Sequence, residues 1–393
     1  MPVAPLQPGH AADAHPSRGR TIALVQSPRP VQPVEAALFL GADPAYDPGL
    51  AEAESEHLRE VLTDCGLRVE TPTDVLRTMP RESLLALAAT AITSSDQERR
   101  LRAVEAARNY SARDLVEVIT RRPHMRTVPD PDLASISPDT GSETFTTFPL
   151  FGMIFPRDTY VDLGGAVAIA GMRRADRTSE TAVMTAVLER LRGKPAEAVL
   201  AAPHFLEGGD VAVCGPVAFV GIGFRSAQSA VDELWPLLER RFRTVVFVED
   251  TIRRPAEFHL DSWFTLSPAV ALVSKERLDD LRAARCAVYD TASGDRRVPE
   301  RTLTVRAALD GLGIEAVEVG PSDVAACGAN AFFVPGTPAV VVSGSMAKAT
   351  VRALERHGCD VRRVAFTEHH KQSGGIHCAV NTVTPDPTEK EAA

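Results

Sequence analysis

A strand, turn, strand and helix pattern recurs along the second half of the chain, and it limits the fold more than any other feature. Four segments each open with an acidic or amide residue and continue as two apolar runs around a turn: DTYVDLGGAVAIAG from 158, DVAVCGPVAFVGIG from 210, DSWFTLSPAVALVS from 261 and NAFFVPGTPAVVVSG from 330. Helical stretches such as TAVMTAVLERL and MAKATVRALERHG follow, apolar at i, i+3, i+4 and i+7, and then another apolar run. Such a unit cannot bury its faces alone, so the pattern predicts ββαβ repeats stacked around a common centre.

The residue that opens each repeat should occupy an equivalent place near that centre. These residues are Asp158, Asp210, Asp261 and Asn330. Any one of them alone would be an ordinary polar residue at a strand edge. Because the repeat places all four alike, we expect their side chains to converge.

An earlier repeat is expected at the start of the chain. It would comprise TIALVQSP from 21 and VEAALFLG from 34 as strands, then the helix AEAESEHLREVLTDCG and the strand LRVETP. Residues 76–128 are helical in period and lack strand signals, so we expect an inserted helical subdomain there. Residues 129–147 are rich in Pro, Asp and Ser and predict a loop back to the core.

The domain organisation that follows is a catalytic domain over residues 21–385 between two disordered ends, 1–20 and 386–393. The Pro- and Ala-rich start has no apolar h-region, which argues against a secretory signal. The six cysteines lie far apart with no zinc spacing, which is typical of reduced thiols and predicts a cytoplasmic protein.

Charge and hydropathy exclude two classes of partner. The net charge is −9 with a pI near 5.6 and scattered basic residues, so nucleic-acid binding is not expected. No run approaches the roughly 18 apolar residues of a membrane span. A small-molecule partner is favoured, and a homo-oligomer is left open.

Four short strings place reactive side chains beside glycines or at strand ends. They are FPRD with Asp158, EGGD with Glu207 and Asp210, HLDSWF with His259 and Asp261, and GGIHC with His377 and Cys378. A thiol, an imidazole and several carboxylates on one rim suit nucleophilic attack on a cationic carbon, with the carboxylates holding the cation. The alternative for Cys378 alone is a buried inert thiol, since free cysteine packs as a small hydrophobe. Two glycines before it favour a loop that passes close to a ligand.

The ordered set F-x-R-D, E-G-G-D, H-x-D and H-C resembles the arginine deiminases of the guanidine-modifying superfamily, over about residues 20–385. The resemblance implies an α/β fold: a five-bladed α/β-propeller, or pentein fold, of ββαβ repeats with a helical insertion after the first blade. It also implies an arginine deiminase-type hydrolase that converts L-arginine, or a related guanidino compound, to L-citrulline and ammonia.

The same resemblance implies a role for each matching residue. Cys378 would attack the guanidinium carbon, and His259 would be general acid and base. Asp158 and Asp261 would each clasp guanidinium N–H groups, and Glu207 would orient His259 and touch the guanidinium. No metal or organic cofactor is implied. Because three carboxylates repel one another before a cation binds, we expect at least one of them to have a raised pKa.

The part of the family site that reads the amino-acid end of arginine is less well matched. Arg177 and Arg225 match two arginines that grip the substrate carboxylate. Gly152 stands where the family usually has asparagine, and Ser373 stands where it has arginine. Lys371 could supply charge there, although lysine cannot form a bidentate fork.

Two other functions remain open on the sequence alone. An amidinotransferase would pass the amidino group from the same Cys378 intermediate to an amine instead of water. A non-catalytic protein could keep the fold and bind guanidino ligands. The helical insertion favours the hydrolase, and the retained nucleophile argues against a binding protein.

Overall fold

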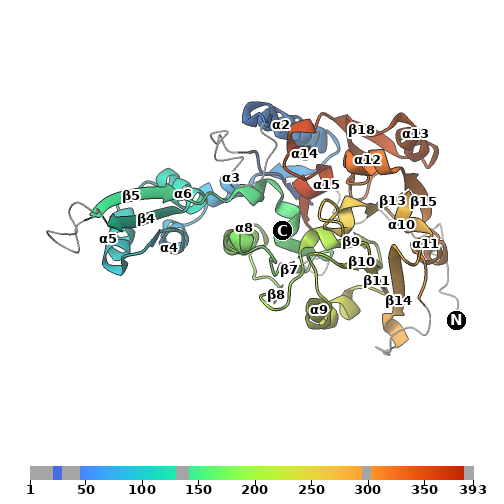
Figure 1. Cartoon of the computed structure of the whole chain (residues 1–393), viewed down its shortest axis with the longest axis horizontal. Helices are drawn as coiled ribbons and strands as arrows, with labels where there is room; N and C mark the ends of the chain where they lie inside the picture. The colour runs from blue at the N-terminus through green and yellow to red at the C-terminus, as the bar shows by residue number, and fades with distance from the viewer. Residues whose placement is uncertain (1–20, 29–44, 130–140, 294–301, 385–393) are drawn as a thin grey trace, which may run out of the picture.

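The repeated segments form small sheets that share one strand order. The computed structural model describes residues 21–28, 45–129, 141–293 and 302–384 (Figure 1). In all six sheets within these ranges, a central strand pairs antiparallel with one neighbour and parallel with the other; in five of them the parallel partner follows the central strand in the chain. The expected ββαβ repeat is therefore confirmed for the described strands.

The strands of these sheets lie where the apolar runs predicted them. Written with the central strand second, the sheets are β6 (Tyr160–Asp162), β7 (Val167–Ile169) and β8 (Ala198–Val199); β9 (Val211–Cys214), β10 (Val217–Ile222) and β11 (Thr244–Asp250); β12 (Phe264–Leu266), β13 (Val270–Ser274) and β15 (Glu315–Val319); β16 (Phe332–Phe333), β17 (Ala339–Ser343) and β18 (Asp360–Val364); and β19 (Asn381–Val383), β1 (Ile22–Leu24) and β2 (Arg68–Glu70). The second of these sheets is extended by β14 (Ala284–Asp290), which pairs with β11.

A helical segment connects each central strand to its parallel partner, as a parallel crossover requires. These helices are α2 (Pro48–Asp64), α8 (Thr178–Arg192), α9 (Gln228–Arg241), α10 (Lys275–Leu278) with α11 (Val305–Leu312), and α13 (Lys348–Arg356). In α8 the buried Val183, Met184, Val187 and Leu188 recur at helical spacing on one face. Gly193 then ends α8 with a left-handed φ of 69°.

The first repeat is built differently from the sequence prediction. Residues 21–28 were expected to be its outer strand, but β1 is the central one, because β19 from the other end of the chain pairs antiparallel with it. The strand expected at 34–41 lies outside the described residues, as do the ends 1–20 and 386–393. A local repeat predicts only the order of strands within its own stretch of sequence. It therefore cannot reveal that Ile22, near the start of the chain, pairs with Val383 near the other end. This pairing brings Cys378, which precedes β19 by a few residues, close to the end of the first sheet.

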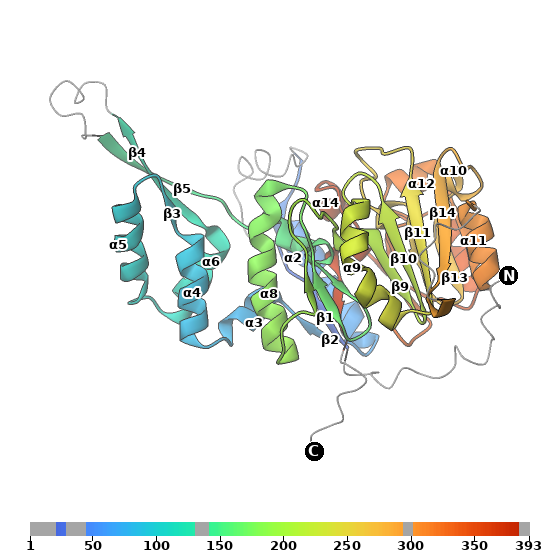
Figure 2. The ribbon, with the colours of Figure 1, turned by 90° about the horizontal axis from the view of Figure 1, so that it is seen from below.

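The inserted segment contains helices and also a small sheet. The helices are α3 (Pro72–Arg77), α4 (Arg81–Ala91), α5 (Gln97–Ala107) and α6 (Ala112–Arg121), and the strands are β3 (Thr93–Ser94), β4 (Pro123–Pro129) and β5 (Gly141–Thr147). Both views show this part projecting from the body beyond α8 (Figures 1 and 2).

The prediction of a strand-free segment followed by a loop at 129–147 is therefore wrong. β4 and β5 pair along their whole length, with Met125 opposite Phe145. Phe145 is 68% exposed, so this ribbon lacks the buried face that creates an alternating hydrophobic pattern.

Among the described residues, no helix combines the length and the apolar character needed to cross a bilayer.

Glu54 of α2 fastens the segment that leads to Cys378. Its carboxylate accepts hydrogen bonds from the backbone N–H of Glu368 at 3.0 Å and of His369 at 3.2 Å, and from His369 Nδ1 at 2.9 Å. These donors belong to α14 (Thr367–His370). Burial opposes the charge of Glu54, but the His369 side chain and the backbone donors outweigh it and lower its pKa from 4.5 to about 2.

Glu54→Gln should therefore lower the free energy of unfolding at neutral pH by about 3 kcal/mol at most. A lowered native pKa gives stability that is fully present above pH 4.5 and is lost as the pH falls towards 2. Denaturant titrations across this range should show the difference from wild type shrinking at low pH. Glu56→Gln, at an exposed position of the same helix, is the matched control, and an equal loss in both variants contradicts the assignment.

Candidate active site

The nucleophile loop carries Cys378 on the short helix α15 (Ile376–Ala379), directly after two glycines. A Cβ at Gly374 would overlap the ring of Phe155, and one at Gly375 would lie 2.5 Å from Asn330 Oδ1. The close approach that the sequence predicted for these glycines is therefore an approach to the protein's own side chains.

Asn330 and Asp261 surround the thiol. Asn330 Nδ2 donates to Cys378 Sγ at 3.1 Å and to the Asp261 carbonyl at 2.9 Å, and Cys378 N–H donates to Asn330 Oδ1 at 3.2 Å. Cys378 Sγ lies 3.5 Å from Asp261 Oδ2. Burial, followed by the charges of Asp261 and Asp158, raises the pKa of the Cys378 thiol well above its usual range. The thiol is therefore protonated at neutral pH in this arrangement.

His259 lies between two carboxylates. Its Nε2 donates to Glu207 Oε2 at 2.7 Å, and its Nδ1 lies 3.5 Å from Asp158 Oδ1. Burial opposes protonation, but Asp158 and the hydrogen bond with Glu207 raise the pKa of His259 to about 10. His259 is thus an imidazolium at neutral pH and can donate a proton.

Asp261 is held by the residue next to the nucleophile. His377 Nδ1 lies 2.8 Å from Asp261 Oδ2. Burial acts against the Asp261 charge, but the His377 hydrogen bond outweighs it and lowers the pKa of Asp261. Asp261 therefore remains a carboxylate beside Cys378.

The expectation of a raised pKa among the three clasping carboxylates is wrong for Glu207 and Asp261. Burial disfavours the charge of Glu207, but its hydrogen bond with His259 lowers its pKa to about 2. The repulsion is offset because protein cations lie between the carboxylates. Raised values belong to two neighbours, where burial dominates: Asp210, whose pKa rises to about 7, and Glu180.

Three buried polar atoms around this centre lack a hydrogen-bond partner among the described residues: Asp158 Oδ1, His259 Nδ1 and Asp261 Oδ1. Their residues are each at most 3% exposed, and Cys378 is 7% exposed. Buried polar atoms are rarely left unpaired, so such a set marks a place where another group binds. The two oxygens are acceptors suited to N–H groups.

A metal is a poorer fit to the same residues. Asp158, Glu207 and His259 offer ligand-type atoms within 4.8 Å of one another. Metal binding needs a neutral imidazole nitrogen. Here His259 Nε2 is hydrogen-bonded to Glu207, and its raised pKa keeps it protonated. The donor set favours a protonated imidazole between carboxylates.

The structure brings together the four residues that open the repeats. Asp158 lies beside His259, and Asp210 accepts from the backbone N–H of Leu260, next to His259, at 2.7 Å. Asp261 and Asn330 both contact the Cys378 thiol. A protein-family model described as arginine deiminase matches residues 44–384 of the chain. The chain belongs to the arginine deiminase family.

Relatives of this arginine deiminase family member are distant in sequence. An arginine deiminase of Rhodococcus jostii is 28% identical over 297 residues, which cover 67% of this chain and 72% of that protein. One from Mycolicibacterium gilvum is 27% identical over 258 residues, covering 62% and 63%.

Solved structures with the same fold come from the pentein superfamily. The N-terminal domain of ArgZ, covalently bound to a reaction intermediate, has a TM-score of 0.55 at 15% identity, and the match covers 93% of this chain and 98% of that one. DDAH from Pseudomonas aeruginosa, complexed with citrulline, has a TM-score of 0.55 at 13% identity, covering 92% and 98%. These structures support the α/β fold, and membership of the arginine deiminase family makes the chain an enzyme that acts on guanidino groups.

Three residues of this family member were expected to bind the substrate carboxylate. Two of them, Lys371 and Arg177, are bonded to other groups of the protein instead. Lys371 Nζ donates to Glu368 Oε1 at 2.7 Å and to the Ala45 carbonyl at 2.8 Å, and neither partner belongs to the centre around Cys378. Arg177 lies in the centre, but it is bonded to Asp158 and Glu180. Ser373 is exposed with a left-handed φ of 63°.

Arg225 does face the centre of this family member. Its guanidinium stacks over Phe258 at 4.6 Å, and Nη1 lies 3.6 Å from Glu207 Oε1. Its buried Nε lacks a hydrogen-bond partner among the described residues. Arg225 can therefore still bind an anionic group.

Sequence reasoning missed several contacts in the family member's site. It did not foresee that Asn330 would bind the thiol, that His377 would hold Asp261, or that Glu180 would hold Arg177. A signal existed for Asn330, because it opens its repeat where the others have aspartate. No pattern pointed to Glu180, which reads as an ordinary helix residue.

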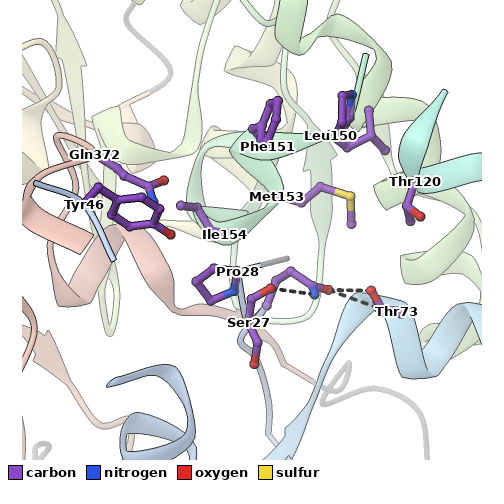
Figure 3. A pocket seen from close by; sticks show the side chains of 12 residues that line it. Ser27, Pro28, Tyr46, Thr73, Thr120, Leu150, Phe151, Met153, Ile154 and Gln372 are labelled. Atoms are coloured by element: carbon purple, nitrogen blue, oxygen red, sulfur yellow. Dashed lines mark hydrogen bonds between the residues drawn. The ribbon is translucent and has the colours of Figure 1, made fainter. Parts of the chain in front are cut away.

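Two hollows in this family member differ in whether they reach residues of the site. One pocket is lined by Phe151, Met153 and Ile154, by Ser27, and by Gln372 just before the nucleophile loop, among others (Figure 3). Cys378 does not line it. Another hollow reaches His259 and Asp210 from the side of Phe258. The thiol and the carboxylates are enclosed by the protein in this structure.

Proposed function

We propose that this protein hydrolyses L-arginine to L-citrulline and ammonia through a covalent intermediate on Cys378. The observation that carries the proposal is that Asp158 Oδ1 and Asp261 Oδ1 accept no hydrogen bond from the described residues, while Asp261 lies beside the Cys378 thiol. Two carboxylate acceptors fit the N–H groups of one guanidinium, which would place its carbon near sulfur. Membership of the arginine deiminase family supports this reaction.

In the proposed architecture, the five sheets of common strand order are the blades of a five-bladed α/β-propeller. The residues that open the repeats would then lie around its central axis, which accounts for the meeting of Asp158, Asp210, Asp261 and Asn330. The segment from α3 to β5 would be an insertion after the first blade of one cytoplasmic catalytic domain. The proposed partner is this small guanidino substrate, and the proposal includes neither nucleic acid nor a membrane.

The first chemical step proposed is formation of the carbon–sulfur bond. A guanidinium bound between Asp158 and Asp261 offsets the negative field that raises the thiol pKa, so Cys378 loses its proton to solvent. The thiolate attacks the guanidinium carbon. His259 donates its proton to the departing nitrogen, the carbon–nitrogen bond breaks, and ammonia leaves a positively charged thiouronium on sulfur.

The second step proposed is hydrolysis of that thiouronium. His259, now neutral, takes a proton from a water molecule that attacks the same carbon. The carbon–sulfur bond then breaks as the hydroxyl proton of the adduct passes to sulfur, which releases citrulline and returns the Cys378 thiol. Glu207, through its 2.7 Å hydrogen bond, holds the imidazole in place during both proton transfers.

The test is whether citrulline and ammonia form in equal amounts from L-arginine when no amine is added. Equal formation supports the hydrolase. Formation of ornithine and an amidinated amine, only after an amine is supplied, would identify an amidinotransferase. An inert protein that still binds arginine would favour the non-catalytic reading.

The raised thiol pKa predicts a ligand-dependent thiolate. We expect the ultraviolet thiolate absorbance at neutral pH, taken as the difference between wild type and Cys378→Ala, to be small without ligand and to rise with millimolar guanidinium ion. Tetramethylammonium, a cation without N–H groups, is the control at equal ionic strength. Thiolate that is already present without guanidinium, or that appears equally with both cations, contradicts the proposed order of events.

A further inference from the structure

The Arg177 guanidinium is fully engaged by the protein itself. Nη1 donates to Asp158 Oδ2 at 2.5 Å, Nε to Glu180 Oε2 at 2.9 Å, and Nη2 to the carbonyls of Gly152 at 2.9 Å and Phe155 at 3.3 Å. Arginine has five N–H donors, so these bonds leave one. Binding a carboxylate with a bidentate fork needs two parallel N–H groups. Arg177 cannot offer such a fork without releasing Asp158 or Glu180.

Charge and burial favour the same arrangement. Arg177 is 9% exposed and Glu180 is 2% exposed, so each charge depends on the other for compensation. Burial disfavours the Arg177 charge, but Glu180 and Asp158 outweigh it and raise the pKa of Arg177. Breaking either ion pair to bind a substrate anion would leave a buried carboxylate uncompensated.

Gly152 is the residue that makes room for this arrangement. A Cβ built at Gly152 would overlap both Arg177 Nε and Glu180 Oε1. No φ in the left-handed region explains this glycine, so the reason for it is space. Any larger residue here would push the Arg177 and Glu180 side chains apart.

We propose that Arg177 is a positioning residue that holds Asp158 for the guanidinium, and that it does not bind the carboxylate end of the substrate. Glu180 and the space at Gly152 fix it in that role. Arg225, which keeps an unpartnered Nε–H within the described residues, is then the arginine available to the distal group of the substrate. The inference rests on the proposed function and concerns how that same site selects its substrate.

The consequence is a division of labour between the two arginines. Disturbing Arg177 should impair reaction of every guanidino substrate alike, because each needs Asp158. Disturbing Arg225 should impair carboxylate-bearing substrates more than others. L-Arginine and agmatine, which is the same molecule without its carboxylate, separate the two roles.

The experiment compares kcat and KM for both compounds in wild type and in the charge-balanced double variant Arg177→Gln with Glu180→Gln. We expect kcat to fall about 100-fold for both compounds, because a misplaced catalytic group costs that much, and the ratio of their kcat/KM values to change less than about threefold. A loss confined to L-arginine, seen in KM, overturns the inference and restores a carboxylate-binding role.

Further variants keep the test decisive if the double variant does not fold. Arg177→Lys keeps the charge but loses the fork, and the same equal loss is expected from it. Gly152→Ala should impair both compounds alike, whereas Gly311→Ala, at a helix position with open space, should leave both rates unchanged. Arg225→Gln should raise KM for L-arginine more than for agmatine, and equal effects on both contradict the division.

The outcomes also separate this inference from the proposed function. If wild type turns over neither compound, the proposed function fails, and the inference fails with it. If wild type forms citrulline from L-arginine but the Arg177 variants lose activity on L-arginine alone, the proposed function stands and only the inference falls.

Discussion

Replacing Cys378 by alanine is expected to reduce citrulline formation by at least about 10⁴-fold, because the proposed reaction has no route without the sulfur nucleophile. The fold should remain, since the side chain fills little volume in the loop. Mass spectrometry of wild-type protein trapped during turnover should show an amidino-type adduct on Cys378. The variant should show no such adduct.

The other cysteines supply the controls for this prediction. Burial raises the pKa values of Cys214 and Cys286 to about 12, so neither thiol forms a competing thiolate at neutral pH. Cys359→Ser, at a half-buried position away from the site, should retain wild-type turnover. Turnover that survives in Cys378→Ala, or an adduct on another cysteine, contradicts the assignment of the nucleophile.

The repeats and the reactive residues could be predicted from the sequence because each is recognisable within a short stretch of residues. Alternating apolar runs with turn residues between them identified the sheets, and helical spacing identified α8, α9 and α13. The opening residues of the repeats met at one place because equivalent positions in stacked repeats face one centre. The expected convergence of Asp158, Asp261 and Asn330 is therefore seen, and Asp261 and Asn330 both contact Cys378.

The features that were missed depend on contacts between distant segments or on exposed elements. The pairing of β1 with β19 joins the two ends of the chain, and no local pattern records it. In the paired strands β4 and β5, exposed residues do not alternate with buried ones, so the sequence shows no period of two there. Hydrogen bonds with His259 and His377 lower the pKa values of Glu207 and Asp261, which simple repulsion between carboxylates would raise.

In the proposed assignment, Arg177 matches the family pattern but has a different role from the one that the match implies. Its position agrees with the family pattern, and its buried place in the centre agrees as well. What redirects its side chain is the combination of Glu180 and a glycine at 152, and neither residue has an obvious meaning in the sequence alone. The role of a residue in this site therefore depends on which side chains it contacts.

Loss of the imidazole is the second large effect we expect. His259→Gln should lower kcat for L-arginine by about 10³-fold or more, because one side chain serves as acid for ammonia departure and as base for water attack. Glutamine keeps a donor and an acceptor but cannot move a proton at neutral pH. Steady-state ammonia release measures the loss, and His57→Gln, at an exposed position on α2, is the matched control.

The pH dependence of the wild-type enzyme tests the same role from another direction. His259 must be protonated to act as the acid, and its pKa of about 10 means that this requirement is met at neutral pH and is lost only as the pH rises through that value. Glu207 is one of the groups that raise this pKa, and burial opposes it. Glu207→Gln should therefore move the alkaline limb of the kcat/KM profile to lower pH. An alkaline limb that does not move in Glu207→Gln, or ammonia release in His259→Gln within tenfold of wild type, would assign the proton transfers to a different group.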